Sequence, residues 1–178
     1  LGCPDNDGDG WANPDGSAVA HPVGTADAFP SDQTQWNDTD GDGYGDNSSG
    51  NNADDCPTQA GSAIVTGSVG CPDADGDGSP DNVVDFPNDP TQWRDTDGDG
   101  FGDNASGNSP DDCPYDAGTS WVDLVGCPDR DNDGWANKPI GDDQFPDNPT
   151  QWIDSDGDGW GDNASGTNPD EFPADQTQ

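Results

Sequence analysis

The chain has 178 residues, of which 39 are acidic and three are Lys or Arg, so its formal net charge is −36. Only 26% of its residues are hydrophobic, while 26 are Gly and 17 are Pro. This composition excludes a conventional hydrophobic core, and the charge disfavours nucleic acids and anionic membranes as partners. No apolar run reaches the length of a membrane span, so we expect no membrane insertion.

Aspartate dominates the acidic residues, because Glu171 is the only glutamate. Solvated acidic tails are generally rich in Glu, whereas the shorter Asp side chain suits tight turns. A chain rich in Asp and Gly is therefore better explained by oxygen ligands around a hard cation. Each divalent ion would cancel two charges, so we expect folding and metal binding to be one event.

Two kinds of acidic loop alternate along the chain. One kind follows Gly-Cys-Pro at 2–4, 70–72 and 126–128, and the other follows Thr-Gln-Trp at 34–36, 91–93 and 150–152. This spacing is typical of internal repeats. We predict three repeats of two loops each, over 1–57, 71–114 and 127–178, separated by disulfide-bracketed connectors at 58–70 and 115–126. Because both termini fall within repeats, we expect the chain to be a segment of a longer array.

Regular secondary structure is expected to be scarce, because Gly and Pro interrupt every segment. The alternating stretches 62–69 and 119–125 predict hairpin-like strands, and the segments leading to each Thr-Gln-Trp predict single turns of helix. The predicted fold is an irregular, elongated tandem repeat array that calcium and disulfides hold together.

Six loops carry Asp at positions 1, 3 and 5 and Gly at position 6. Alternate residues of a tight loop point inward, so three carboxylates converge on one ion, and the Gly brings the position-7 carbonyl round as a fourth ligand. The predicted triads are Asp5, Asp7, Asp9 (loop 1); Asp38, Asp40, Asp42 (loop 2); Asp73, Asp75, Asp77 (loop 3); Asp95, Asp97, Asp99 (loop 4); Asp129, Asp131, Asp133 (loop 5); and Asp154, Asp156, Asp158 (loop 6). In the same order, position 7 is Trp11, Tyr44, Ser79, Phe101, Trp135 and Trp160, and the oxygen donor at position 9 is Asn13, Asp46, Asp81, Asp103, Asn137 and Asp162.

Position 12 carries no acid in any loop, which excludes EF-hand-like sites. An acid instead comes just before each following Phe-Pro or Cys-Pro, and we predict that it closes the site. These sealing acids are Asp27, Asp54, Asp85, Asp111, Asp143 and Asp170, with Asp55 and Asp112 as close rivals.

This pattern resembles the thrombospondin type 3 repeats, including bacterial versions found in surface proteins. The run from Asp73 to Asp85-Phe86-Pro87 matches the family's loop at nearly its usual length. The resemblance covers essentially the whole chain and implies calcium packed along an extended chain, with about six or more ions here. The sequence departs from the family where inserts lengthen five loops, where Phe replaces Cys at 29, 86, 145 and 172, and where Asp85 comes one place late.

Two other interpretations of the acidic loops are less favoured. Asp-Gly runs also form plain hydrated turns, but six loops in register make that interpretation improbable. Magnesium suits these loops less well, because flexible carboxylate loops favour a larger ion with more ligands.

Cysteine spacing predicts two disulfides, because Cys56 and Cys71 bracket the same junction as Cys113 and Cys127. A zinc site is the alternative, but the sequence has no clustered ligands for it. Cys3 occupies the equivalent place without a partner in this chain, and we expect its partner in a preceding repeat. Disulfides indicate an extracellular or cell-surface protein.

Aromatic residues recur at two places. Trp36, Trp93 and Trp152 lie near Phe-Pro pairs and are expected to pack on them, whereas the position-7 rings are expected to make surface contacts with other subunits or with sugar. Asn37, Asn47, Asn104 and Asn163 begin Asn-x-Ser/Thr sequons, which predict glycosylation unless they are only turn chemistry.

An architectural role is favoured over catalysis, because one His and one Glu leave no plausible acid–base pair. We predict a calcium-stiffened rod, stalk or filament segment whose partners are copies of itself or further repeats. The alternative is a calcium-dependent adhesion module that recognises glycans.

Overall fold

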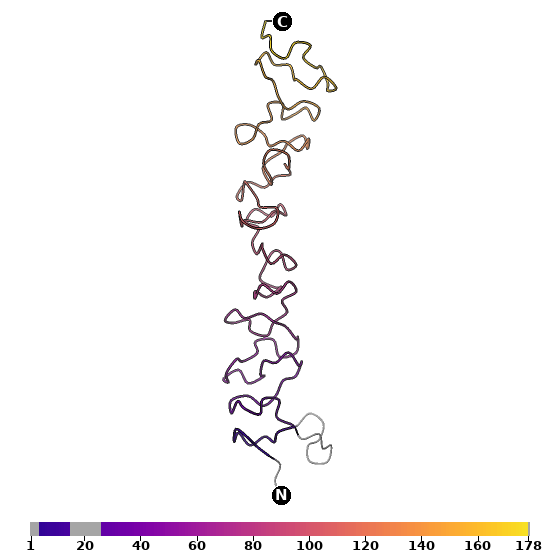
Figure 1. Ribbon diagram of the computed structural model, residues 1–178. Helices are drawn as coiled ribbons and strands as arrows, with labels where there is room; N and C mark the ends of the chain where they lie inside the picture. The colour runs from indigo at the N-terminus through magenta and orange to yellow at the C-terminus, as the bar shows by residue number, and fades with distance from the viewer. Residues whose placement is uncertain (1–3, 15–25, 178) are drawn as a thin grey trace. The chain divides into compact units, whose positions relative to one another are not determined.

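The structure, a computed structural model, describes residues 4–14 and 26–177. Turns and bends make up these residues, which contain neither a helix nor a strand (Figure 1). Isolated bridges join single residues, for example Gly45 to Ala53 and Gly102 to Pro110. The prediction of an irregular fold with little regular structure is therefore confirmed, whereas elongation and the repeat boundaries stay predictions.

Two compact units make up the chain, Leu1–Pro90 and Thr91–Gln178. The first unit contains loops 1 to 3, and the second contains loops 4 to 6. The boundary falls in the segment that leads into the second Thr-Gln-Trp.

The strands predicted at 62–69 and 119–125 do not form. Their backbone groups bond to neighbouring parts of the chain instead of pairing as a hairpin. The N–H of Ile64, for instance, donates to the carbonyl of Gly78 in loop 3 at 2.9 Å, and the second stretch bonds to loop 5 in the same way. The alternating pattern here reflects contact with the following metal loop, so the strand prediction was wrong.

The single helical turns predicted before each Thr-Gln-Trp are also wrong. The chain makes two successive tight turns there, with the N–H of Asp32 on the carbonyl of Phe29 and the N–H of Gln35 on that of Asp32, both at 2.9 Å. The Asp32 carboxylate accepts the N–H of Thr34 at 3.0 Å. Because a short polar side chain competes for backbone amides in this way, it favours a turn over a helix.

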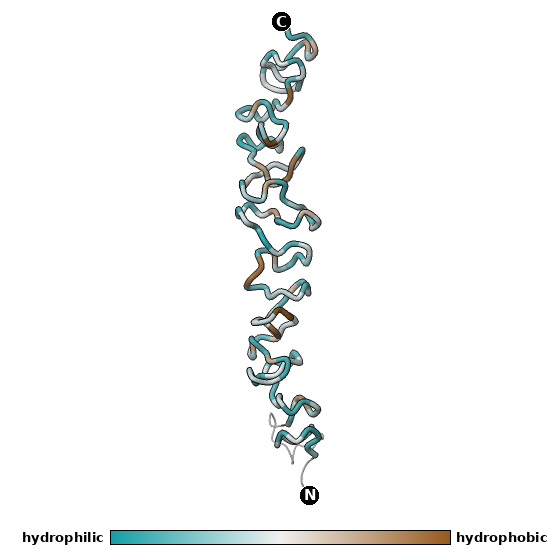
Figure 2. The backbone as a smooth tube through the Cα atoms, turned by 90° about the vertical axis from the view of Figure 1, so that its left-hand side faces the viewer, coloured by the Kyte–Doolittle hydropathy of each residue, from teal (hydrophilic) through white to brown (hydrophobic). Residues whose placement is uncertain are grey.

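Polar side chains form the interior. The buried apolar residues are small (Ala63, Cys71, Cys127 and Ala136), and apolar segments are short and scattered along the chain (Figure 2). The largest fully buried side chains are glutamines of the Thr-Gln-Trp motifs, namely Gln35, Gln92 and Gln151. Buried polar groups require hydrogen-bond partners, and these glutamines have them.

Each buried glutamine organises the loop that follows it. Gln35 donates from Nε2 to the carbonyl oxygens of Asn47 and Asn51, and its Oε1 accepts the Asn47 N–H, all at 3.0 Å. Gln92 and Gln151 make the equivalent bonds in loops 4 and 6. The variable insert of each of these loops is therefore folded around one side chain.

Replacement of Gly102 tests this packing, because a Cβ there would lie 2.1 Å from Oε1 of Gln92. We expect Gly102→Ala to destabilise the calcium-loaded chain by about 1–3 kcal/mol, measured by thermal unfolding. The control is the same change in a Gln92→Ala background, where it should cost less because the clash is gone. Equal costs in the two backgrounds would contradict the packing.

Both predicted disulfides are present. Cys56 pairs with Cys71 at a Cα separation of 5.0 Å, and Cys113 pairs with Cys127 at 5.1 Å. These pairs exclude the zinc alternative for the four cysteines and are consistent with a non-cytoplasmic protein. Cys3, whose partner was left open, lies outside the described residues.

Candidate metal centres

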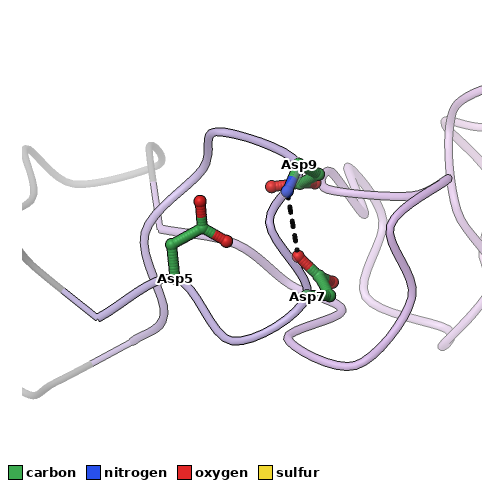
Figure 3. Close-up of side chains that lie close together, drawn as sticks. All are labelled: Asp5, Asp7 and Asp9. Carbon is green, nitrogen blue, oxygen red and sulfur yellow. Dashed lines mark hydrogen bonds between the residues drawn. The ribbon is translucent and has the colours of Figure 1, made fainter.

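The structure brings the predicted triads together. In the loops that begin at Asp5, Asp38, Asp73, Asp95 and Asp129, the carboxylates at positions 1, 3 and 5 each place one oxygen within 4.8 Å of the others. Figure 3 shows the three carboxylates of loop 1 around a single tight turn of the chain. Such oxygen groups can hold a metal ion.

Backbone amides fix the orientation of each triad. In loop 1 the Asp5 carboxylate accepts the N–H groups of Gly8 and Gly10, Asp7 Oδ1 accepts that of Asp9, and Asp9 Oδ1 accepts that of Trp11. Gly10 has a φ of 98°, which explains the Gly at position 6. Corresponding bonds recur in loops 2 to 6.

Eight of the triad oxygens are buried without partners. The atoms concerned are Oδ2 of Asp7, Asp9, Asp40, Asp97, Asp131, Asp133, Asp156 and Asp158. A buried carboxylate oxygen with no donor is costly in a protein interior. A cation among these oxygens removes that cost, so the donor set fits a hard metal ion.

The predicted sealing acids of five loops are buried. Asp27, Asp54, Asp111, Asp143 and Asp170 are all at least nine-tenths buried, and the Oδ2 atom of each has no partner. Their Oδ1 atoms accept the N–H two residues later, at 2.6–2.8 Å. Each sealing acid thus presents one free oxygen in a fixed direction.

The backbone holds the sealing acid in place whatever the length of the insert. The N–H of Asp27 donates to the carbonyl of Ala12 at 2.9 Å, and that of Asp143 donates to Ala136 at 3.0 Å. Both acceptors are at position 8 of their loops, and loops 2, 4 and 6 use position 8 in the same way. Inserts of different lengths therefore return to one docking point.

Burial and nearby carboxylates raise the pKa values of four sealing acids. Burial raises the pKa of Asp111 and that of Asp143 to about 6, against the lowering effect of a backbone N–H. Repulsion from triad carboxylates, chiefly Asp99 and Asp133 respectively, raises these pKa values further. Burial also raises the pKa of Asp27 and Asp54, again with triad carboxylates contributing. A cation would offset this repulsion.

The rival sealing acids face elsewhere. Asp55 and Asp112 are exposed, and each accepts an N–H of the connector, from Val69 and Val125, at 2.9 Å. They fasten the connector to the loop rather than closing the triad. Asp85, the predicted sealing acid of loop 3, is also exposed.

Position 9 braces the loop. Asp46 accepts the N–H and the hydroxyl of Thr39, at position 2, at 3.1 and 2.6 Å. In loops 1 and 5 the Oδ1 atoms of Asn13 and Asn137 also accept the position-2 N–H. The same bond is made in the other loops by Asp81, Asp103 and Asp162. The predicted ligand roles of position 9 and of the position-7 carbonyl both stay predictions.

Two position-7 rings stack on the tryptophan of the following Thr-Gln-Trp motif instead of forming only surface contacts. Trp11 and Trp36 are parallel with centroids 6.3 Å apart, and Trp135 and Trp152 are parallel at 6.0 Å. Trp160, by contrast, is half exposed. Each stack covers a metal loop with a residue from the following segment.

Each disulfide-bracketed connector bonds to the loop before it and to the loop after it. The N–H of Gly61 donates to Oδ2 of Asp42 in loop 2 at 3.0 Å, and the hydroxyl of Ser62 donates to Asp73 in loop 3 at 3.2 Å. In the second connector, Gly118 bonds in the same way to Asp99 at 2.9 Å. The connectors thus join the metal loops on either side of them.

The sequon asparagines inside the inserts form hydrogen bonds that hold the turns. The side-chain nitrogens of Asn47, Asn104 and Asn163 each donate at 2.8 Å to a carbonyl of the preceding Thr-Gln-Trp motif. Asn37 donates to Thr39 at 3.1 Å and also to Asp46. A glycan would use these same nitrogens, so the contacts favour turn chemistry, and glycosylation stays a prediction.

Residues that the sequence patterns did not single out complete the sites. The buried glutamines recur in every Thr-Gln-Trp motif, and that recurrence is a sequence signal for them. Asp123 of the second connector accepts the N–H groups of Ala136 and Asp142, both at 2.8 Å. Although burial would raise its pKa, these backbone donors lower it below its usual value. In loop 5, Asp123 thus bonds to the insert as the glutamines do in loops 2, 4 and 6.

Comparison with known proteins gives no relative from which a role can be transferred, since no family model and no curated protein matches the chain. Among the described residues there is no helix long and apolar enough to cross a membrane. The chemical case therefore depends on the loops themselves, whose acidic groups can hold metal ions.

Proposed function

We propose that the chain is an extracellular calcium-binding structural protein, a segment of a calcium-rigidified rod, stalk or self-assembling filament, and a member of the thrombospondin type 3 repeat class. The main support comes from five loops, each of which has a buried sealing acid whose Oδ2 atom has no hydrogen-bond partner. All-oxygen sites with several carboxylates suit Ca²⁺ better than softer metals. The ion would supply charge neutralisation that holds the loops closed.

A structural role rather than catalysis is supported by how the acids are used. Their oxygens accept backbone N–H groups or are buried inside a loop without a partner, an arrangement suited to holding a cation. The partners expected are copies of the same chain or further repeats. Connectors that bond to successive loops would transmit order along such an array.

Imaging tests the architectural proposal. Negative-stain electron microscopy of the native assembly in calcium should show rods or filaments, and small-angle scattering of the purified chain should give an elongated particle. Compact, isolated globules in both measurements would contradict it.

A second candidate, calcium-dependent glycan recognition, is favoured by one feature of loop 6. A hollow of about 340 Å³ there is lined by Asp158, Trp160, Pro169, Asp170 and Glu171. A hollow that combines an aromatic ring with a few polar groups is the kind of place where small ligands bind. Saturable sugar binding that is lost in Trp160→Ala, with calcium uptake retained, would support this function. Absence of binding across a glycan panel would exclude it.

A further inference from the structure

Loop 3 differs from the other loops at the sealing position. In loops 1, 2, 4, 5 and 6 the sealing Asp is two residues before Phe-Pro or Cys-Pro, but in loop 3 that place is Val84. The acid of loop 3, Asp85, comes one residue later and is exposed. It corresponds in register to Asp55 and Asp112, which fasten connectors rather than closing a triad.

The backbone of loop 3 differs at the same point. In loop 4 the position-8 carbonyl of Gly102 accepts the N–H of the sealing acid Asp111 at 2.9 Å. In loop 3 the position-8 carbonyl of Pro80 accepts the N–H of Val83 at 3.0 Å. The docking point that holds a sealing acid elsewhere is therefore used for a local turn.

Loop 3 also lacks the buried free oxygens of the other loops. Every other loop has at least two carboxylate oxygens that are buried without a partner, whereas Asp73, Asp75, Asp77 and Asp85 have none. Its triad is nevertheless assembled within the same 4.8 Å limit. Loop 3 is thus a triad without a closing carboxylate.

We propose that loop 3 is the weakest metal site of the chain, so that it empties at calcium concentrations at which its neighbours stay loaded. This inference rests on the proposed calcium-binding function. The affinity of calcium loops rises with the number of charged ligands, so the absence of one carboxylate should weaken loop 3 by at least about tenfold.

Glycine-selective NMR of the full chain tests this order of binding. The amides of Gly76 and Gly78 report on loop 3, and those of Gly98 and Gly100 report on loop 4, as free calcium is lowered with a calcium buffer. We expect the loop 3 resonances to change at a free calcium concentration at least about tenfold higher than those of loop 4.

Substitutions at the sealing position provide matched controls. Val84→Asp should move the loop 3 midpoint toward that of loop 4, and Asp111→Val should move the loop 4 midpoint toward that of loop 3. Asp85→Asn should leave the loop 3 midpoint within about twofold, because Asp85 is exposed and an exposed charge contributes little. If Val84→Asp fails to fold, Asp111→Val still tests the effect of the sealing acid.

The outcomes distinguish failure of the weak-site inference from failure of the proposed calcium-binding function. Loop 3 midpoints equal to or lower than those of loop 4, or an Asp111→Val chain with unchanged loop 4 binding, would overturn the weak-site inference while leaving calcium binding intact. A chain in which no glycine resonance responds to calcium would overturn the proposed function itself.

Discussion

Removal of calcium by a chelator is expected to abolish the ordered structure of the whole chain. The reason is electrostatic, because a net charge of −36 on 178 residues opposes any compact state, and triad carboxylates repel the buried sealing acids Asp111 and Asp143. The buried apolar side chains are too small to offset this repulsion.

Near-ultraviolet circular dichroism follows this loss most directly. The stacked pairs Trp11–Trp36 and Trp135–Trp152 should give a strong aromatic signal in calcium that disappears in excess chelator and returns when calcium is added back. Sodium chloride at high concentration is the control. It screens the charges but places no cation among the carboxylates of the loops, so it should not restore the signal. A spectrum that chelator leaves unchanged would contradict the proposed coupling of folding to metal.

Loss of the disulfides is expected to produce the second-largest effect. Replacing the pair Cys113 and Cys127 by Ser should lower stability in calcium by about 3 kcal/mol, the value typical for a loop of this length. The same change should weaken metal binding in loop 4, because the disulfide closes the connector whose Gly118 N–H holds Asp99 at 2.9 Å.

A comparison of calcium binding in loops 4 and 1 separates a connector-specific effect from a general loss of stability. Loop 4 touches the second connector, whereas loop 1 has no disulfide-bracketed connector bonded to it among the described contacts. Calcium titration of the Cys113→Ser/Cys127→Ser variant should therefore weaken loop 4 and leave loop 1 unchanged. Equal weakening of both loops would indicate general destabilisation and would contradict a connector-specific role.

The local chemistry of the loops was predictable from sequence because it depends on spacing. Asp at alternate positions followed by Gly determines the triad within a few residues, and the two cysteine pairs bracket equivalent segments. Little regular structure was also predictable, since Gly and Pro interrupt every segment. These features are local, so they depend little on distant contacts.

Contacts across an insert were not predictable in the same way. The docking of Asp143 on Ala136 and the burial of Gln151 depend on how an insert of variable length folds back. The alternation of apolar and polar residues at 62–69 predicted a strand. Contact of every second residue with a neighbouring loop gives the same pattern as contact with a sheet. The sealing position has a sequence signal, a fixed distance of two residues before Phe-Pro or Cys-Pro, and that distance would have distinguished Asp54 from Asp55 and revealed Val84.

Counting the calcium ions on the intact chain tests the central claim most directly. Native mass spectrometry across a calcium series should show saturable uptake of about six ions, with the last one bound most weakly, and Asp143→Asn should weaken a single further step. Uptake that never saturates, as for a diffuse acidic surface, or a chain that retains no calcium would contradict the assignment of the loops as calcium sites.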